Sequence, residues 1–362
     1  MTTIQAASYD IVFNQSGYDA LNVLLLQSSY SKIFVIVDDH THEDCLAPFL
    51  GNLATEIPIE VIEIPHGEIN KTIETCSGVW DALATLDADR KGLVINVGGG
   101  VVTDLGGFVA STFKRGMDFI NVPTSLLSMV DASVGGKTGV DLGTLKNLIG
   151  VINNPQMVLI DGGFLATLPP EELRSGLAEM YKHGLIADQS YWNKLKNLSE
   201  MTTDDLSQLI YESIIIKNEI VLQDPREQSI RKTLNYGHTL GHAIESYCLA
   251  SDTRKTLLHG EAIAIGMILE SYLSVELTGL SKDALDDITT TLNDMYEEVA
   301  FAKADIEPII EYLKHDKKNT NGNINFVLLE SIGSAVIDKQ APNELIYKAF
   351  DHYLESTQQA TL

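Results

Sequence analysis

The chain has 362 residues, 44% hydrophobic and 21% charged, which is typical of an ordinary globular protein long enough for two domains. Its net charge of −25 argues against nucleic acid or an anionic membrane as a partner, because both require a basic surface. No apolar run has the length of a membrane span, the N-terminus lacks a signal-peptide pattern, and the three cysteines are widely spaced, so we expect a soluble cytoplasmic protein.

The first half of the chain alternates short apolar runs with helical stretches, and each run ends in polar or glycine-rich residues. Continuous apolar strands separated by helices are typical of parallel sheets buried on both faces, so we expect a mainly parallel α/β sheet. Ligands bind at the carboxyl ends of the strands in such sheets. The predicted strands are residues 33–37, 61–64, 93–97, 119–122 and 157–160.

A glycine-rich turn, Gly98 to Gly100, follows the third predicted strand. It is not the GxGxxG dinucleotide fingerprint, because Thr103 stands where the third glycine would fall. Glycines nevertheless let the backbone approach a diphosphate, and the helix that follows offers free N–H groups. We interpret this turn as a candidate nucleotide site, and a tight turn without a ligand is the alternative.

A second glycine–lysine segment, SVGGKT at residues 133–138, is similar to part of a triphosphate-binding loop. It does not fit that motif, because Asp131 occupies the position of the required first glycine and no strand precedes it. We expect instead a flexible loop that presents Lys137.

After Pro169 and Pro170 the pattern changes to long helical periodicity. We therefore place a domain boundary there, with an α/β domain at residues 1–168 and a mainly helical domain at residues 169–362. A late pair of predicted strands, around residues 326–329 and 335–337, is the main exception.

The segment LNYGHTLGHAIE at residues 234–245 has helical spacing, and its His238 and His242 leave the same face one turn apart. Two such imidazoles can both bind a divalent metal, or one can bind it with the other as a base beside it. A zinc-protease motif is excluded, because Thr239 stands where that motif needs glutamate.

Two further segments favour a metal site over a chance pair of histidines. His259 begins a strongly apolar helical run and is followed by Gly260, which lets backbone approach closely. Upstream, Glu179 supplies an acidic candidate, and Lys182 and His183 fall on adjoining parts of its helical face.

Basic residues recur near these glycines and histidines. Each alone is typical of a solvated surface charge, but together they can form a cluster for phosphate and carboxylate, in which arginine gives bidentate contacts. The basic residues are Arg115, Lys137, Lys146, Lys182, Lys217, Arg231, Lys317 and Lys318.

These motifs, in this order, resemble the 3-dehydroquinate synthase family of the sugar-phosphate cyclase superfamily. The resemblance extends from about residue 38 to residue 333. The sequence departs from it at Asp141, where many relatives have asparagine. The motifs that carry it are GGGVVTDLGGFVA at 98–110, VDASVGGKT at 130–138, KNLIG at 146–150, GLAE at 176–179, LNYGHTLGHAIE at 234–245 and HGEAIAIG at 259–266.

The resemblance implies a Rossmann-like NAD-binding domain followed by a mainly α-helical metal-binding domain. It implies a lyase of the shikimate pathway to aromatic amino acids, acting as a homodimer in the cytoplasm. Its sugar-phosphate substrate would be 3-deoxy-D-arabino-heptulosonate 7-phosphate, converted to 3-dehydroquinate and phosphate. The reaction would combine transient oxidation by NAD, phosphate elimination, reduction and an intramolecular aldol step.

The family's site residues transfer to matching positions of this sequence. Zn2+ or Co2+ would be bound by Glu179, His238 and His259. His242 would be the catalytic acid/base, assisted by Lys137, Lys182, Arg231 and Asn235. NAD would contact Asp38, Glu68, Lys71, Gly99, Gly100, Asp104, Thr124, Ser125, Lys146 and Thr167. Substrate would contact Arg115, Asp131, Lys137, Asn147, Lys182, Lys217, Arg231, Asn235, Lys317 and Lys318, with Arg115 reaching the neighbouring subunit's substrate.

Three alternatives remain open. A sister cyclase would make a 2-deoxy-scyllo-inosose or epi-valiolone product from another sugar phosphate. A metal-dependent polyol dehydrogenase would release NADH to solution. A non-catalytic nucleotide-binding protein would not need His259 and Glu179 together with the glycine-rich turn.

Overall fold

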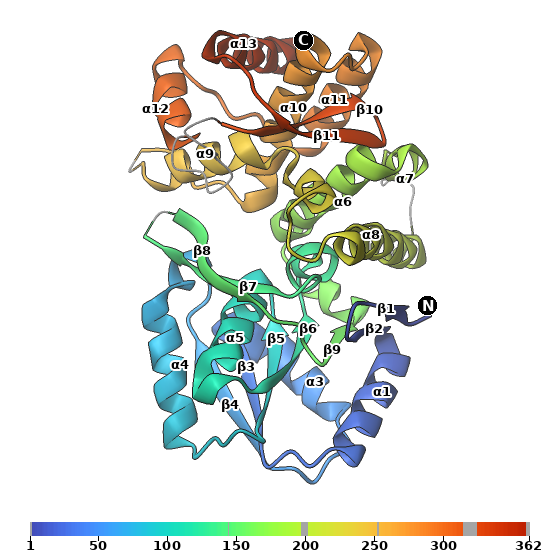
Figure 1. Cartoon of the computed structure of the whole chain (residues 1–362), viewed down its shortest axis with the longest axis vertical. Helices are drawn as coiled ribbons and strands as arrows, with labels where there is room; N and C mark the ends of the chain where they lie inside the picture. Colours follow the sequence, from blue (N-terminus) through green and yellow to red (C-terminus); the bar gives the residue numbers. More distant parts are fainter. Residues whose placement is uncertain (1, 144, 197–201, 252, 314–323, 360–362) are drawn as a thin grey trace. The chain divides into compact units, whose positions relative to one another are not determined.

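The computed structural model describes residues 2–143, 145–196, 202–251, 253–313 and 324–359. The chain divides into two compact units, Met1–Leu173 and Arg174–Leu362. The first is built on a β-sheet, and the second consists mainly of helices (Figure 1). Lys317 and Lys318, two predicted substrate contacts, lie outside the described residues.

A seven-stranded sheet forms the centre of the first unit, in the order β1-β2-β9-β6-β5-β3-β4. Neighbours from β2 to β4 run parallel, and β1 pairs antiparallel with β2. The middle strands are buried along nearly their whole length, as their continuous apolar sequence predicts. The strands are β1 Ile4–Gln5, β2 Asp10–Phe13, β3 Ile33–Asp38, β4 Ile59–Ile64, β5 Leu93–Gly98, β6 Asp118–Pro123 and β9 Met157–Ile160.

Helices cover both faces of this sheet (Figure 1). On one face α4 and α5 pack against the strands, and Phe34, Val94 and Leu105 belong to the same apolar core. On the other, α1 and α3 contact each other through Tyr18 and Phe49. The helices are α1 Asn14–Gln27, α2 Asp39–Thr41, α3 Ala47–Gly51, α4 Ile73–Thr85 and α5 Gly100–Thr112.

A separate antiparallel hairpin, β7 Lys137–Leu142 and β8 Leu145–Ile152, packs on α5. Gly107 permits this contact, because a Cβ there would lie only 2.5 Å from Thr138 Cγ2. The predicted loop is present at residues 133–136, which form a turn and bends, but Lys137 itself begins β7 and pairs with Ile152. The glycines around the segment indicate a loop, whereas the packing against α5 that makes it a strand is not visible in the local sequence.

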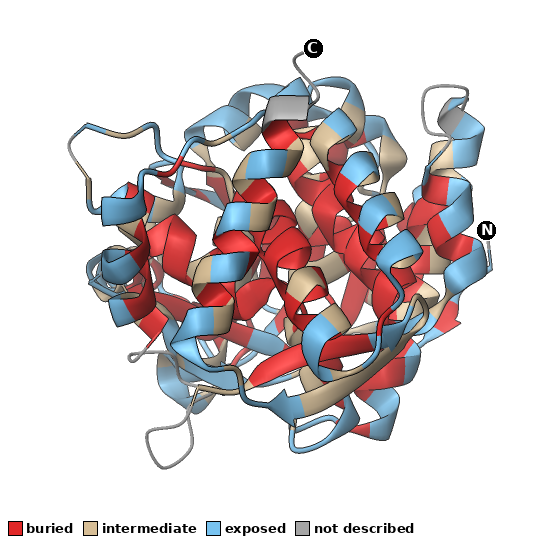
Figure 2. Ribbon diagram, turned by 90° about the horizontal axis from the view of Figure 1, so that it is seen from above, coloured by how far each residue is buried: buried red, intermediate tan, exposed pale blue. Residues whose placement is uncertain are grey.

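The second unit is organised around α10, which is apolar on all sides and buried along most of its length. Figure 2 shows such long buried stretches in several helices. Helix α10 contacts α9, α11, α13 and β10. Strands β10 and β11 form an antiparallel pair. The elements are α6 Pro170–Ala187, α7 Gln189–Leu195, α8 Thr203–Gln223, α9 His238–Leu249, α10 His259–Leu277, α11 Lys282–Met295, α12 Lys303–Leu313, β10 Phe326–Ser331, β11 Ser334–Lys339 and α13 Asn343–Gln359.

The five predicted parallel strands, the helical second half and the late strand pair are confirmed. The sequence reading missed β1, β2 and the β7–β8 hairpin. In the described ranges, none of the helices is both long enough and apolar enough to span a bilayer.

Candidate active site

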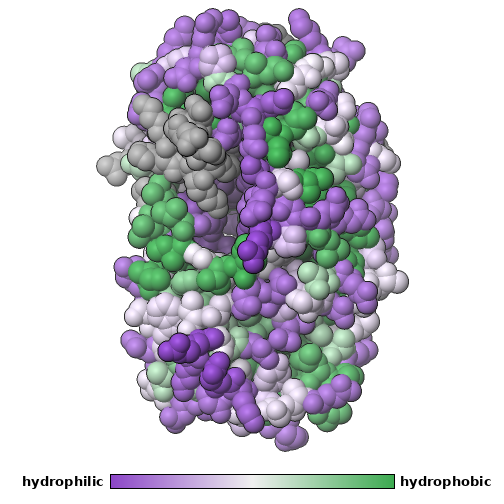
Figure 3. All heavy atoms as spheres, in the orientation of Figure 1, coloured by the Kyte–Doolittle hydropathy of each residue, from purple (hydrophilic) through white to green (hydrophobic). Residues whose placement is uncertain are grey.

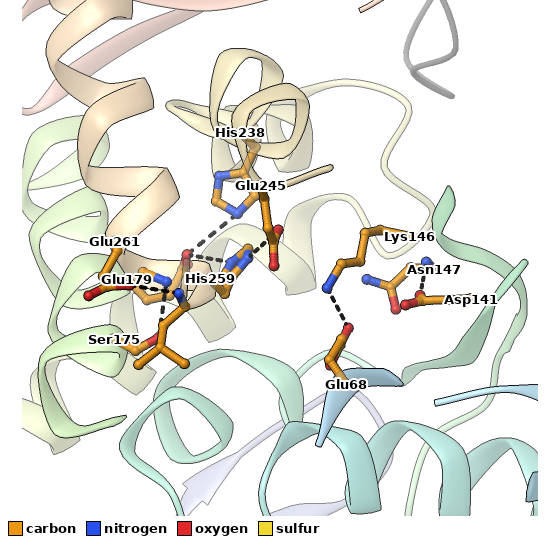
Figure 4. A network of polar contacts seen from close by, with 12 residues as sticks. Glu68, Asp141, Lys146, Asn147, Ser175, Glu179, His238, Glu245, His259 and Glu261 are labelled. Carbon is orange, nitrogen blue, oxygen red and sulfur yellow. Dashed lines mark hydrogen bonds and ion pairs between the residues drawn. The ribbon is translucent and has the colours of Figure 1, made fainter. Parts of the chain in front are cut away.

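Three ligand-type side chains of the second unit converge on one point (Figure 4). Glu179 comes from the buried middle of α6, while His238 and His259 are the first residues of α9 and α10. Glu179 Oε1 lies 3.4 Å from His238 Nε2 and 3.6 Å from His259 Nε2. Residues distant in sequence thus present one carboxylate oxygen and two imidazole nitrogens to a shared space.

This arrangement fits a divalent transition metal. Around a tetrahedral Zn2+ with ligand bonds of about 2.0–2.1 Å, neighbouring ligand atoms are separated by about 3.4 Å. The separations of 3.4 and 3.6 Å match that edge length. Two imidazoles and one carboxylate are also the donor set of catalytic zinc sites, which keep a position open for substrate or water.

The outer nitrogens of both imidazoles are held by acceptors. His238 Nδ1 lies 3.0 Å from the carbonyl oxygen of Tyr236, and His259 Nδ1 lies 3.5 Å from Glu245 Oε2. When the rings are neutral, as metal binding requires, Nδ1–H donors at these positions leave Nε2 as the lone-pair atom that faces the shared space. The sequence reading did not identify Glu245, although it follows His238 and His242 at helical spacing on the same face.

Electrostatics at the centre favour a cation. Glu179 also contacts Lys182 Nζ through its other oxygen, one turn along α6. Burial acts to lower the pKa of His259, but hydrogen bonds with Glu179 and Glu245 outweigh it and raise the pKa to about 9. In the metal-free protein His259 therefore carries a proton at neutral pH, which a bound metal would displace.

His242 lies beside this centre, one turn after His238 on α9. Its ring centroid is 5.1 Å from that of His238 and 5.6 Å from that of His259. A nitrogen from each of the three imidazoles lies within 4.8 Å of the others, so His242 can act as a further ligand or as an acid/base beside the metal.

Glycines at the helix contacts bring the ligands together. Gly260 N donates to Ser175 Oγ at 3.0 Å, and a Cβ at Gly260 would lie 2.1 Å from the Ser175 carbonyl oxygen. Because Ser175 is one turn before Glu179, this contact places His259 beside the carboxylate. The prediction that Gly260 permits a close backbone approach is confirmed.

Further predicted substrate residues of this unit lie on α8 and in the 3-10 helix Ile230–Asn235, where Lys217 and Arg231 are buried and Asn235 is partly buried. Lys217 is buried on α8. Arg231 is buried too and donates from Nη1 to the Pro225 carbonyl at 2.8 Å. Asn235 Nδ2 donates to Glu227 Oε1 at 2.8 Å. His183 lies one turn after Glu179 on α6, with one ring nitrogen within 4.8 Å of a Glu179 carboxylate oxygen, and its Nδ1 makes a hydrogen bond of 2.8 Å with Ser213 Oγ.

In the first unit, predicted NAD contacts follow the carboxyl ends of neighbouring parallel strands. Asp38 ends β3, and its Oδ1 accepts from Thr41 N at 2.7 Å. The glycine turn follows β5, with Gly99 as the N-cap of α5. From β3 the chain continues to β4 on one side, and β5 then lies on the other side of β3. The glycine turn after β5 and Asp38 at the end of β3 therefore flank a topological switch point of the sheet.

Further predicted NAD contacts lie at the carboxyl ends of β6 and β9. Thr124 follows β6, and its N–H donates to the Gly98 carbonyl at 3.0 Å. Ser125 Oγ would lie 3.3 Å from a Cβ at Gly99, so the turn approaches this serine closely. Thr167 follows β9 at the end of the 3-10 helix Gly162–Ala166. The hydroxyl groups of Thr124 and Thr167 both contact the Cys45 thiol.

A buried lysine connects predicted cofactor and substrate contacts of this unit. Lys71 Nζ donates to Asp104 Oδ2 at 2.7 Å and to Asn147 Oδ1 at 2.8 Å. Burial acts to lower the pKa of Lys71, but the carboxylates of Asp104 and Glu68 outweigh it and hold the pKa above its ordinary value. Lys71 is therefore a charged donor at the head of α5.

The hairpin adds the rest of this polar network (Figure 4). Lys146 Nζ donates to Glu68 Oε1 at 2.9 Å. Asn147 has a positive φ of 51°, and its N–H donates to Asp141 Oδ1 at 2.6 Å. Asp141, the departure from the family pattern, thus holds Asn147 in its left-handed conformation.

Three predicted substrate residues of the first unit lie outside this network. Asp131 belongs to the short π-helix Ser128–Ala132, and Lys137 is exposed at the start of β7. Arg115 is exposed on the short connection into β6, as predicted, and has a positive φ of 72°.

Comparisons with known proteins agree with this geometry. Residues 61–175 match the family model described as "3-dehydroquinate synthase N-terminal", and residues 176–319 match "3-dehydroquinate synthase C-terminal". A 3-dehydroquinate synthase of Parabacteroides distasonis is 39% identical over 338 residues, which cover 93% of this chain and 95% of the relative.

Two solved cyclase structures share the fold. A 2-epi-5-epi-valiolone synthase from Streptomyces hygroscopicus subsp. jinggangensis with NAD+ and Zn2+ bound has a TM-score of 0.83 at 27% identity, over 98% of this chain and 99% of that one. A 2-deoxy-scyllo-inosose synthase complexed with carbaglucose-6-phosphate, NAD+ and Co2+ has a TM-score of 0.82 at 24% identity, over 97% and 100%.

Proposed function

Because the chain belongs to the 3-dehydroquinate synthase family, we propose that it converts 3-deoxy-D-arabino-heptulosonate 7-phosphate to 3-dehydroquinate and phosphate. This is a carbon–oxygen lyase reaction of the shikimate pathway, with NAD and a divalent metal as cofactors. The observation that carries the proposal is the convergence of Glu179 Oε1 with the Nε2 atoms of His238 and His259 at 3.4 and 3.6 Å.

Glu179, His238 and His259 would hold the metal. When bound, Zn2+ or Co2+ would polarise a substrate hydroxyl, while NAD would take up and later return a hydride. The contacts of Tyr236 and Glu245 with the outer imidazole nitrogens orient both histidines toward the metal position.

His242 would move the proton of the polarised hydroxyl. It extends from the same face of α9 as His238 and is only partly buried, so its imidazole can exchange a proton with substrate. Imidazole is the side-chain group that most often transfers protons near neutral pH.

Buried basic and amide groups would hold the substrate's anionic ends. Lys182, Lys217 and Arg231 supply positive charge in a chain whose net charge is −25. Arg231 can engage an oxyanion through two parallel hydrogen bonds, and Asn235 adds an amide. Asp131, Lys137, Asn147 and Arg115 would provide the remaining described contacts.

NAD would lie along the carboxyl edge of the seven-stranded sheet. The glycine turn allows close approach to the diphosphate, and the N-terminus of α5 favours its negative charge. Asp38, at the end of the adjacent strand, suits a ribose hydroxyl. The remaining contacts would come from Glu68, Lys71, Asp104, Thr124, Ser125, Lys146 and Thr167. In this assignment residues 1–168 bind NAD, and residues 169–362 bind metal and substrate.

The active form would be a cytoplasmic homodimer. Leu148, Val151 and Ile152 leave apolar side chains of β8 exposed in the single chain, and Figure 3 shows hydrophobic residues gathered over this hairpin. Exposed apolar surface of this kind supports an interface. The three cysteines are free and buried, which supports a reducing compartment.

A substrate panel tests the proposed activity. Purified protein with NAD and Co2+ should release phosphate from the heptulosonate phosphate and form 3-dehydroquinate, with activity lost on chelation and restored by added metal. Other heptose and hexose phosphates should be turned over at least about a hundredfold less efficiently, because unpaired buried polar groups penalise substrates that lack the matching oxygens. Preferential cyclisation of one of those phosphates would assign the chain to a sister activity.

A further inference from the structure

The helix that carries two of the site histidines begins without a capping side chain of its own. The N-cap residue of α9 is Gly237, with a positive φ of 76°. A Cβ at Gly237 would lie 2.5 Å from Met267 Cγ and 3.1 Å from the Ile263 carbonyl oxygen. No residue with a side chain fits there, so the serine, threonine or aspartate that usually caps a helix is excluded.

A carboxylate from the neighbouring helix takes that place. Glu270 is fully buried on α10, three turns after His259. Its Oε2 accepts from Gly237 N at 2.7 Å, and its Oε1 accepts from Thr239 N at 3.1 Å and Leu240 N at 3.2 Å. One side chain thus binds three N–H groups around His238, the first residue of α9.

We propose that Glu270 is a positioning residue of the metal centre: its carboxylate clamps the first turn of α9 to α10 and so fixes His238 relative to His259. The inference rests on the metal centre of the proposed function. Its carboxylate accepts hydrogen bonds from backbone N–H groups, so it acts through the backbone of the turn that carries His238.

The charge of Glu270 has a second effect. The N-terminus of a helix carries roughly half a positive charge, which disfavours a divalent cation held by the first residue of that helix. A carboxylate bound to the N–H groups at that end offsets this charge. The N-terminus of α9 can therefore lie beside the metal position without disfavouring a bound cation.

Substitution by glutamine separates charge from size. Both carboxylate oxygens of Glu270 accept from backbone N–H groups, whereas the glutamine amide has one oxygen and one NH2 group. The NH2 group would then face a backbone N–H, and no hydrogen bond can form between two donors. Glu270→Gln is therefore expected to break part of the clamp and to remove the negative charge, although it preserves the volume. Glu270→Asp keeps the charge but withdraws the oxygens by one methylene.

The experiment is titration of the metal-free full-length protein with Co2+, followed by visible absorption, in parallel with NAD binding. We expect Glu270→Gln to raise the Co2+ dissociation constant about tenfold or more, to alter the cobalt spectrum, and to leave NAD affinity unchanged. Glu270→Asp should fall between Glu270→Gln and the unmodified chain.

Ser274→Ala is the matched control. Ser274 is buried one turn further along α10; its Oγ accepts from Leu329 N at 2.9 Å and donates to the backbone carbonyl of Glu270 at 2.6 Å. The variant removes two buried hydrogen bonds of the same helix but leaves the Glu270 carboxylate unchanged, so it should lower thermal stability while keeping Co2+ affinity within about twofold.

Unchanged Co2+ affinity and spectrum in folded Glu270→Gln would overturn the proposal while leaving the metal centre intact. Equal losses in Ser274→Ala would also overturn it, because they would indicate general loosening of α10. Should Glu270→Gln fail to fold, Co2+ affinity is compared between Glu270→Asp and Ser274→Ala. A loss of affinity in Glu270→Asp alone would support the proposal, and equal affinities would overturn it. Failure of the unmodified chain to bind Co2+ would instead overturn the metal centre, and the Glu270 role with it.

Discussion

At the scale of single residues, Glu179 has two partners of different kinds. One carboxylate oxygen faces two imidazole nitrogens, and the other contacts the buried ammonium of Lys182. The lysine can hold the carboxylate in one orientation, in which its other oxygen faces the two imidazoles. A single anion thereby connects metal binding with a predicted substrate contact.

Substitutions should separate the ligands from the acid/base. Glu179→Gln and His259→Ala are expected to lose metal and activity together, because each removes a ligand. His242→Asn should keep the metal and lower turnover by about a hundred- to ten-thousandfold, the usual contribution of a general acid/base. Elemental analysis alongside turnover checks this assignment. Loss of metal in His242→Asn as complete as in His259→Ala would show that His242 is a ligand.

The raised pKa of His259 predicts a pH dependence of metal binding. The metal requires neutral imidazole, so it must displace the His259 proton at any pH below about 9. Apparent Co2+ affinity should rise about tenfold per pH unit from neutral pH toward 9 and then level off, with about one proton released per metal. Affinity that stays constant across this window would contradict the protonation state.

The raised pKa of His259 also makes the stability of the metal-free protein depend on pH. Because the folded pKa lies above the ordinary 6.5, the proton on His259 contributes stability that is fully present below 6.5 and is lost as the pH rises through about 9. A bound divalent metal would replace this proton with a cation of higher charge.

Sequence patterns were sufficient to predict the residues that surround the metal position but not those that position them. His238, His242, His259 and Glu179 stand in recognisable helical spacing and motifs. Glu270 lies inside an apolar helical run and caps a helix that begins 32 residues earlier, a relation that only packing creates. Lys317 and Lys318 lie outside the described residues, so their role stays a prediction.

At the scale of elements, glycines set the distance between α9 and α10. A Cβ at Gly266 would lie 1.9 Å from the Gly237 carbonyl oxygen, and one at Gly241 would lie 2.8 Å from Ile263 Cδ1. The helices therefore meet backbone to backbone, and their first residues bring His238 and His259 together. Side chains at these positions would force the ligands apart.

Gly266→Ala should consequently destabilise the protein by about 1–3 kcal/mol through overpacking and weaken Co2+ binding as well. Gly78→Ala is the control: this glycine lies inside α4, and a Cβ there meets nothing within 4 Å. That variant should be neutral or up to about 1 kcal/mol more stable, because alanine favours helix. Denaturant unfolding and cobalt titration measure both effects. Equal stability of the two variants would contradict the close helix contact.

The parallel strands could be predicted at this scale because each is a continuous apolar run followed by a polar turn. The β7–β8 hairpin could not, since its strands contain glycines at 139 and 150 that suggest loops. In the structure those two residues face each other across the hairpin: a Cβ at Gly139 would lie 2.4 Å from the Ile149 carbonyl oxygen. The glycines serve close strand pairing, which local sequence does not reveal.

At the scale of the whole molecule, the proposed homodimer predicts complementation between inactive variants. If Arg115 serves the neighbouring subunit's site and Lys182 its own, Arg115→Ala and Lys182→Ala homodimers should each be nearly inactive. Refolded together in equal amounts, about half the dimers should be mixed with one intact site, which restores roughly a quarter of full activity.

The control pair is Lys182→Ala with Arg231→Ala, both in the second unit, for which mixed dimers should contain no intact site. Mass spectrometry establishes that mixed dimers form. Absence of recovery in the first pair would place Arg115 in its own subunit's site or outside any site. Recovery in the control pair would show instead that Lys182 and Arg231 do not serve the same subunit's site.

A 3-dehydroquinate synthase should use its NAD and metal within one catalytic cycle, so that hydride returns to the substrate. The most direct measurement records phosphate release and nicotinamide absorbance together, with the heptulosonate phosphate in large excess over NAD. We expect many phosphates released per NAD, no net accumulation of NADH, and loss of both phosphate and 3-dehydroquinate formation on chelation. One NADH accumulating for each product formed would contradict it and identify a dehydrogenase instead.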